Sequence, residues 1–272
     1  GNSLLGTIPA LLAKGIPDEA FNPIEGDEKK VCSEYKKRNK TERGYTDKAG
    51  RTEGGQVSLL TQLSTPVVKL GNLTQSMLQL DEMQDESLED IEKKQQQYEQ
   101  FIKSQDYLFN HLLADAWCAA FVIKKDGTLP FLITQDVFRK IEENPHWTPQ
   151  WLKEEIGKLR EQYQFFHWHL EFPDVFRVTG KDEKTENEQC GWSGGFDCVL
   201  GNPPWERVKL QEKEWFSERR PDIVEASNAA ERRRLIQALQ NDDMALYNAF
   251  IESRRRADSE SAFVRNTGRF PL

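Results

Sequence analysis

The longest periodic stretch of the chain runs from residue 72 to residue 122. Apolar side chains recur there at helical spacing between Glu, Gln and Lys, which predicts a long amphipathic helix or a helical hairpin. Asn72 or Thr74 is a suitable N-cap for its start. The recurring apolar positions are Leu73, Met77, Leu80, Leu88, Ile91, Tyr98, Ile102, Leu108 and Leu112.

We expect this helical segment to pack on itself or on a sheet through Leu80, Leu88, Ile91 and Leu112. A dimerising coiled coil is the alternative, but the heptad pattern breaks at two glutamine positions. The continuation over residues 114–121 is apolar enough to be buried.

Shorter helices are predicted on both sides of this segment. Residues 1–25 contain Pro and Gly punctuation and predict a loop with little helix. A helix over 28–42 is followed by a charged, Gly-containing linker. Two short helices are expected within 134–165, and two more over 210–220 and 228–256.

Two stretches have the pattern of β-strands. The aromatic run at residues 165–173 alternates and is stopped by Pro173, which favours a strand or a buried extended segment. Residues 177–195 are polar and Gly-rich, as in a loop. The short apolar run at 196–200 then predicts a second strand, ending at Gly201.

The composition limits the class of protein. Of 272 residues, 37% are hydrophobic and 30% are charged, with a net charge of −8, which argues against a wholly basic surface for nucleic acid. No apolar run approaches the roughly 20 residues needed to span a bilayer, so we expect a cytoplasmic protein without a membrane partner. The four cysteines include no C-x-x-C pair, which disfavours a zinc site; Cys118 and Cys198 lie in apolar runs and are expected to be buried.

The strongest chemical signal follows the predicted strand at 196–200. Gly201 leads into Asn202, Pro203, Pro204 and Trp205. Two prolines stiffen the backbone and remove two N–H donors. An Asn before Pro is held out of the helical region, which presents its amide at the end of the strand. In open α/β sheets, ligands bind at that edge; a rigid turn without a ligand is the alternative.

This motif resembles motif IV of the amino-group DNA methyltransferases, (Asp/Asn/Ser)-Pro-Pro-(Tyr/Phe/Trp). The resemblance implies that a target adenine is flipped out of double-stranded DNA and stacks on Trp205. Asn202 and the carbonyl of Pro203 would accept hydrogen bonds from its exocyclic amine, while Pro204 fixes the turn. The amine then attacks the methyl group of S-adenosyl-L-methionine, so catalysis is mainly positioning and electrostatics.

Other segments are similar to large adenine methyltransferases of restriction-modification and phage-defence systems, including the DISARM-type methylases. These segments are residues 1–6, 117–121, 166–176 and 268–272. In that group a Gly-(Asp/Asn)-(Ser/Ala)-Leu turn follows the third strand and meets the adenine of the cofactor. The resemblance assigns this role to Asn2.

Two parts of the family pattern do not occur in the sequence. The Phe-x-Gly-x-Gly loop that binds the methionine end of S-adenosylmethionine is absent, and no acidic residue is a candidate for the ribose. The chain opens without Met, and we expect both ends to be cuts through a longer polypeptide. We therefore expect this chain alone to bind the cofactor weakly or not at all, and to be inactive.

Two weaker signals favour structural roles. His167 and His169 could be two metal ligands, but no Cys or carboxylate follows at ligand spacing, so aromatic packing is favoured and no metal is expected. The arginine triplets at 232–234 and 254–256 could contact phosphates, although a charged helix face is more often simply solvated.

The sequence thus predicts an α/β fold: part of a Rossmann-like methyltransferase sheet with a large, mainly helical insertion. We expect four divisions. Residues 1–25 contain the end of the third strand and a loop, and residues 26–71 form a charged linker. The helical insertion spans residues 72–165, and the catalytic segment spans residues 166–272.

The predicted function is adenine-specific DNA methylation with double-stranded DNA and possible subunits of a defence system as partners. There are two alternatives. The chain could be a non-catalytic fragment that binds DNA or a partner, or it could be part of a fused restriction-methylation enzyme.

Overall fold

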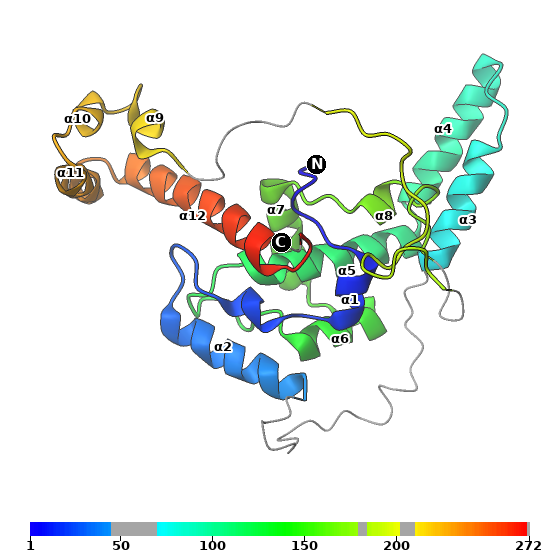
Figure 1. The fold of residues 1–272 in the computed structure, drawn as a ribbon, viewed down its shortest axis with the longest axis horizontal. Coiled ribbons are helices and arrows are strands. Elements are labelled where there is room, and N and C mark those ends of the chain that lie inside the picture. Colours follow the sequence, from blue (N-terminus) through cyan, green and yellow to red (C-terminus); the bar gives the residue numbers. More distant parts are fainter. Residues whose placement is uncertain (45–69, 179–183, 202–209, 271–272) are drawn as a thin grey trace.

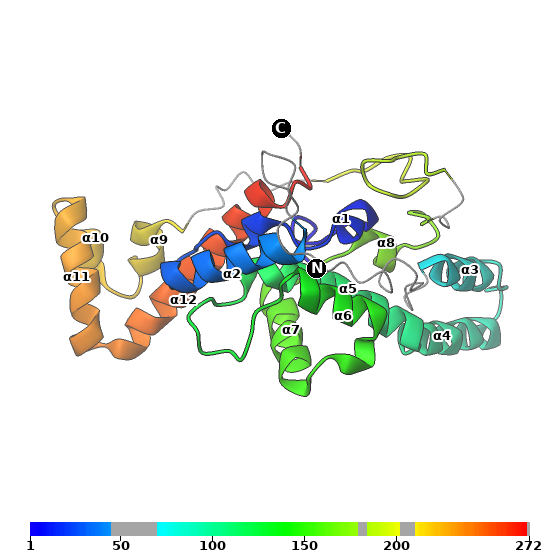
Figure 2. The same ribbon diagram turned by 90° about the horizontal axis from the view of Figure 1, so that it is seen from below.

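Helices make up the molecule, as seen in a computed structural model that describes residues 1–44, 70–178, 184–201 and 210–270. The central body is built around helix α5 (Gln105–Val122). A hairpin of α3 and α4 projects from one end of the body, and a small group of helices, α9 to α11, stands at the other end (Figures 1 and 2).

Helix α5 is the core of the body. Ser104 caps its start by accepting a hydrogen bond from the backbone N–H of Tyr107. From Asn110 to Val122 every side chain but Leu112, which is half-buried, is buried. The Trp117 indole N–H donates to the carbonyl of Gly15 at 2.9 Å. The prediction that residues 114–121 are buried is confirmed.

Five helical segments contribute with α5 to one continuous hydrophobic core. Helices α2 and α7 confirm the helices predicted over 28–42 and late in 134–165, and α6 confirms the other. The segments are α1 (Pro9–Lys14), the 3-10 helix η1 (Asp18–Phe21), α2 (Lys29–Glu42), α6 (Gln135–Glu143) and α7 (Gln150–Tyr163), with a second 3-10 turn η2 (Pro145–Trp147) before α7.

The segment predicted as one long helix or a hairpin over 72–122 is helical, but it consists of three helices: a hairpin of α3 (Leu70–Asp81) and α4 (Leu88–Ile102), followed by α5. Helix α3 begins before Asn72 and Thr74, so neither of them is its N-cap. Leu80 is buried there, in a second core cluster with Leu73, Phe101, Ala114 and Leu170. The predicted burial of the next two apolar positions was wrong: Leu88 is 73% exposed and Ile91 is 50% exposed. The apolar face of α4 therefore lacks the covering that its sequence pattern predicts.

The C-terminal helices form a third core of their own. It comprises Phe216, Ile223, Ile236, Leu239 and Phe250. The helices are α9 (Glu212–Phe216), α10 (Pro221–Val224), α11 (Ala229–Asp242) and α12 (Met244–Asn266). The single helix predicted over 228–256 is divided in two at Asp243, whose side chain caps α12 by accepting from the N–H of Leu246.

Helix α12 joins this group to the central body (Figure 1). Near its end, Phe263 is fully buried against Trp117 and Phe121 of α5. Earlier in the helix, Arg255 donates to Asp27 at 2.8 Å. Asp27 also lies 3.8 Å from the ammonium of the fully buried Lys125, so one carboxylate ties three distant segments together.

The predicted fold class was wrong. The described residues contain no strand and no sheet, only three isolated bridges, of which Asn2 with Phe165 is the parallel one. The run predicted as a strand at 165–173 makes that single bridge and then turns into the short helix α8 (Trp168–Glu171). Residues 196–200 are described, but they pair with no strand.

The physical reason is that an apolar, alternating run specifies only that one face is buried. A strand also needs a neighbouring backbone to complete its hydrogen bonds. Phe166 has one such bond, from its N–H to the carbonyl of Leu5 at 2.8 Å. Helices and aromatic rings cover the buried side of this segment, so its apolar side chains are buried without a β-ladder.

No helix in the described ranges is long and apolar enough to cross a membrane. The linker expected after residue 42 falls mostly on positions 45–69, outside the described residues. The predicted divisions at 25, 71 and 165 stay predictions.

Leu113 and Leu108 on α5 provide a matched test of this core. Leu113 is 4% exposed and Leu108 is 51% exposed. Leu113→Ala should lower the free energy of unfolding by about 2–5 kcal/mol because it removes buried methyl groups and leaves a cavity. Leu108→Ala should change it by no more than about 0.5 kcal/mol. Urea denaturation measures both, and equal effects would contradict the central position of α5.

Candidate functional site

The four residues of the predicted catalytic loop, Asn202 to Trp205, lie outside the described residues. Their approach is described as far as Gly201, and the chain is described again from Leu210. The site is therefore built from its surroundings: the turn that carries Asn2, the aromatic segment before the loop, and the polar groups beneath both.

Asn2 lies in a tight turn beside the aromatic segment. Its backbone N–H donates to the carbonyl of Gln164 at 2.5 Å, and its side-chain oxygen accepts from the N–H of Leu4 at 3.1 Å. The side chain is half-buried. This amide thus stabilises the turn and is partly accessible from outside it.

Gly6 allows the close approach of these two segments. A Cβ atom at this position would lie 1.8 Å from the carbonyl oxygen of Phe166, far inside any allowed contact. The guanidinium of Arg269 donates to the carbonyl of Gly6 at 3.1 Å. The glycine therefore lets the first turn, the segment at 166 and the end of the chain meet in one place.

Aromatic rings fill the segment that precedes the predicted catalytic loop. Trp168 is in contact with four of them, at centroid distances of 4.9 Å for Phe166, 5.9 Å for Phe172, 5.7 Å for Phe176 and 5.8 Å for Phe196. Phe196 also packs edge-on against Phe172 and Phe176. These contacts anchor the chain six residues before Asn202.

Beyond Phe196 the chain leaves this cluster. Val199 is 74% exposed and Leu200 is 93% exposed. Cys198 is exposed as well, so its expected burial was wrong, whereas Cys118 is buried as predicted. Aromatic packing thus fixes the start of the approach to the loop and leaves its last residues uncovered.

A buried network of hydrogen bonds lies beneath the aromatic segment. His167 Nδ1 accepts from the N–H of Thr7 at 3.1 Å, and Nε2 lies 2.9 Å from a carboxylate oxygen of Asp115. Because Nδ1 is an acceptor, Nε2 carries the proton and donates to Asp115. Arg160 approaches the other carboxylate oxygen at 3.6 Å. The network joins the first segment, α5, α7 and α8.

Burial controls the charge of this network. It lowers the pKa of His167 to about 3, helped by Arg269 and Arg160, and raises the pKa of Asp115 to about 6. At neutral pH the imidazole is therefore neutral and the carboxylate is ionised. A neutral donor beside an ionised acceptor makes a charge-assisted hydrogen bond, which suits a structural tie.

Two further imidazoles lie beside this network without hydrogen-bond partners among the described residues, His111 and His169. Burial lowers the pKa of His111 to about 3, and it lowers the pKa of His169 well below its usual range. His169 stacks on Trp192, with ring centroids 6.3 Å apart. In the described ranges no three His, Cys, Asp or Glu side chains are placed to hold a metal ion.

Each arginine of the triplet at 254–256 has an ion-pair partner. Arg254 pairs with Glu25 at 3.1 Å and Arg256 with Glu260 at 3.2 Å, while Arg255 pairs with buried Asp27. Arg255 therefore ties α12 to the body, while contact of the triplet with phosphates stays a prediction.

The Asp115–His167 pair was missed by the sequence analysis. The signal was present, since Asp115 is the one charged residue in the apolar run from Leu112 to Val122. A carboxylate inside a buried helix needs a partner. The sequence gives no indication that the partner is His167, because 52 residues separate the two.

The comparison with protein families assigns the chain. The family model described as Eco57I restriction-modification methylase matches residues 57–262. The chain belongs to this family. The matched range includes the α3–α4 hairpin, α5 and the Asn-Pro-Pro-Trp motif. No curated protein and no solved structure matches the chain.

Membership of this methylase family confirms the resemblance to restriction-modification methylases. The similar segments named from the sequence also meet in space where they are described: Gly6 contacts Phe166 and Arg269, and Trp117 contacts Phe263 close to that end of the chain. The grouping with DISARM-type methylases stays a prediction.

The buried imidazoles predict how stability depends on pH. Their folded pKa values lie below the unfolded value of 6.5, so between pH 6.5 and about 3 the unfolded chain binds more protons. The free energy of unfolding should therefore fall as the pH falls through this window. Asp115 has the opposite shift and offsets part of the loss below pH 6. Urea denaturation at pH 7 and pH 4.5 measures the effect.

Two variants separate the effect of the buried imidazoles from the titration of carboxylates. His169→Leu removes one buried titrating group and should lose less stability on acidification than the wild type. His146→Leu, at an exposed position, should keep the wild-type pH dependence. If both variants behave alike, the buried imidazoles do not cause the acid sensitivity.

Proposed function

We propose that this methylase-family chain takes part in adenine-specific methylation of DNA, with S-adenosyl-L-methionine as methyl donor. The observation that carries the proposal is the sequence Asn202-Pro203-Pro204-Trp205, which lies inside the range matched by the family. Its exposed approach, at Val199 and Leu200, supports a loop that meets a ligand rather than one that fills a core.

The chemistry of the motif favours an amino group as the target. The side-chain oxygen of Asn202 and the carbonyl of Pro203 are hydrogen-bond acceptors, and a proline at 204 removes the competing N–H. Two acceptors orient the exocyclic amine of an adenine, so that its lone pair points away from them. Such positioning in a site without water lowers the barrier without a protein nucleophile.

Trp205 supplies a face on which the adenine stacks. An adenine within a duplex cannot reach such a ring, so the proposal includes rotation of the target base out of double-stranded DNA. The net charge of −8 means that phosphate contacts depend on local groups of arginine rather than on the whole surface. Other subunits of a defence system are further proposed partners.

Asn2 is the proposed contact for the cofactor. Its amide is half-buried in the turn against Phe166, and a side-chain amide offers both donor and acceptor to the edge of an adenine. S-adenosylmethionine would supply the electrophilic methyl group. No other described residue is assigned to it, and the sequence contains no Phe-x-Gly-x-Gly loop.

The first test removes the acceptor at Asn202. Asn202→Ala should lower the rate of methyl transfer about 100-fold or more, by analogy with the loss of one preorganised hydrogen-bonding group. Asn202→Asp retains an acceptor oxygen and should keep more activity. The assay follows labelled methyl from S-adenosylmethionine into adenine of cognate duplex DNA, with a preparation of the methylase that is active. Asn241→Ala, at an exposed position of α11, is the control. Wild-type activity in Asn202→Ala would mean that the motif is only a rigid turn.

The second test concerns stacking on Trp205. Trp205→Ala should weaken binding of DNA with a flipped adenine, because stacking contributes roughly 1–3 kcal/mol per base. Trp205→Phe keeps a ring face and should be tolerated. Binding is measured by anisotropy with a duplex that carries a mismatch at the target base, which lowers the cost of flipping. Equal binding by the Ala and Phe variants would exclude a stacking role.

A further inference from the structure

Helix α4 exposes an apolar face. It has 15 residues and an amphipathic pattern, but Phe101 near its end is its one buried residue. Leu88, Ile91 and Tyr98 are 73%, 50% and 42% exposed. Most helices in proteins are stabilised by packing of their apolar face, so an amphipathic helix left in this state indicates a surface that another element covers.

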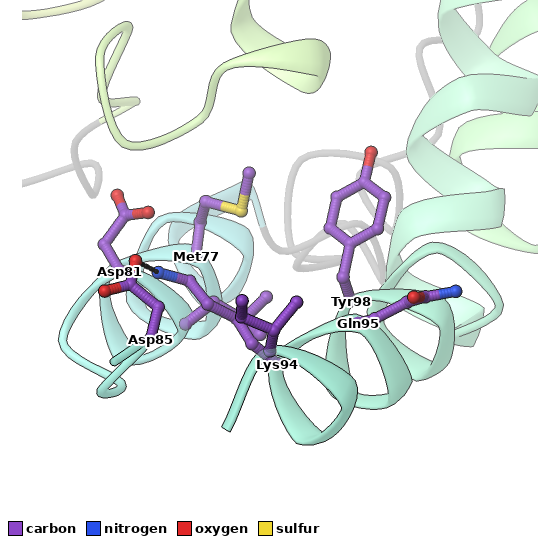
Figure 3. A pocket seen from close by; sticks show the side chains of 8 residues that line it. Met77, Asp81, Asp85, Lys94, Gln95 and Tyr98 are labelled. Carbon is purple, nitrogen blue, oxygen red and sulfur yellow. Dashed lines mark ion pairs between the residues drawn. The ribbon is translucent and has the colours of Figure 1, made fainter. Parts of the chain in front are cut away.

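A groove between α3 and α4 runs along this face. Its volume is about 360 Å³. Met77 from α3 and Tyr98 from α4 project on the same side of the hairpin, and Asp85 pairs with Lys94 at one end (Figure 3). The lining residues are Met77, Leu80, Asp81, Asp85, Ile91, Lys94, Gln95 and Tyr98.

The apolar floor of this groove is edged by negative charge. Residues 81–94, the turn and the start of α4, contain seven Asp and Glu against two Lys. Two of these carboxylates, Asp81 and Asp85, line the groove together with Lys94, which pairs with Asp85, so the lining keeps a net negative charge. Such a field attracts a cationic partner and repels phosphates. It also opposes pairing of two identical hairpins.

We propose that the α3–α4 groove is a docking site for a basic amphipathic helix of a partner protein. The apolar side chains of that helix would enter between Met77, Ile91 and Tyr98, and its Lys or Arg side chains would face Asp81 and Asp85. An amphipathic helix laid into an apolar groove is a recurrent mode of protein recognition. This surface is independent of the catalytic proposal, because none of its residues belongs to the motif at 202–205.

The test uses a defined probe. A labelled peptide of about 14 residues, four helical turns, carries Leu at helical spacing and Lys elsewhere. Its binding to the chain is followed by fluorescence anisotropy at low and at physiological salt. A peptide of the same composition in scrambled order removes the apolar face, and one with Glu in place of Lys reverses the charge. We expect only the amphipathic basic peptide to bind, and more weakly at higher salt.

Variants locate the binding site. Ile91→Ser with Tyr98→Ser should weaken binding of the basic peptide about tenfold or more, as expected for central apolar contacts. Asp81→Lys with Asp85→Lys should do the same and should reduce the salt dependence. The controls are Gln100→Ser, exposed on α4 outside the groove, and Glu161→Lys, exposed on α7. Both controls should bind as the wild type does.

Hydrogen exchange and sedimentation complete the test. Bound peptide should slow exchange in α3 and α4 and leave α11 unchanged. The proposal is overturned if the basic peptide does not bind, or if the groove variants bind it as the wild type does. The same holds if duplex DNA displaces the peptide and the groove variants also weaken DNA binding. It is also overturned if the chain alone is a dimer that Ile91→Ser with Tyr98→Ser converts to monomer, because a second copy would then occupy the groove. Circular dichroism confirms that each variant, all at exposed or half-buried positions, is folded.

Discussion

Helix α5 is surrounded by protein along most of its length, and the arrangement of the other helices depends on covering it. A helix that is apolar on all sides cannot lie at a surface. Segments from the start, the middle and the end of the chain therefore meet on it: Gly15 accepts from Trp117, Phe263 of α12 packs on the same indole, and α7 lies along another side. The α3–α4 hairpin has a smaller core cluster of its own, and part of its apolar surface remains exposed.

Two polar groups make this packing specific. Asp115 within α5 needs a donor, which His167 supplies, and the same imidazole accepts from Thr7. Lys125, just past the end of α5, donates to the carbonyls of Phe121 and Ile123 and faces Asp27. Burial lowers the pKa of Lys125 to about 8, so it remains mainly charged at neutral pH. Removing one partner from either group would leave a buried charge or donor unsatisfied.

These buried hydrogen bonds and ion pairs matter for the proposed function because of the segments that they hold in place. His167 lies within the aromatic segment whose rings, around Trp168, anchor the chain before the Asn-Pro-Pro-Trp motif. Thr7 follows the turn that contains Asn2. One buried imidazole thus joins the turn that carries Asn2 to the aromatic segment that precedes the motif in the chain. The acidic hairpin is directed away from the body (Figure 1), where a protein partner could dock without entering that region.

Local sequence determined most of the helices, because helical periodicity and capping residues such as Ser104 act within a few positions of the chain. It also determined the proposed catalytic motif, Asn202 to Trp205, because that motif consists of four consecutive residues. Only the tertiary structure decided between strand and helix at Phe165 to Glu171, since a strand requires a neighbouring backbone that no local pattern specifies. It alone placed His167 on Asp115 and left Leu88 and Ile91 exposed. Apolar spacing predicts that a face will be buried, whereas the element that buries it can lie anywhere in the chain or in a partner.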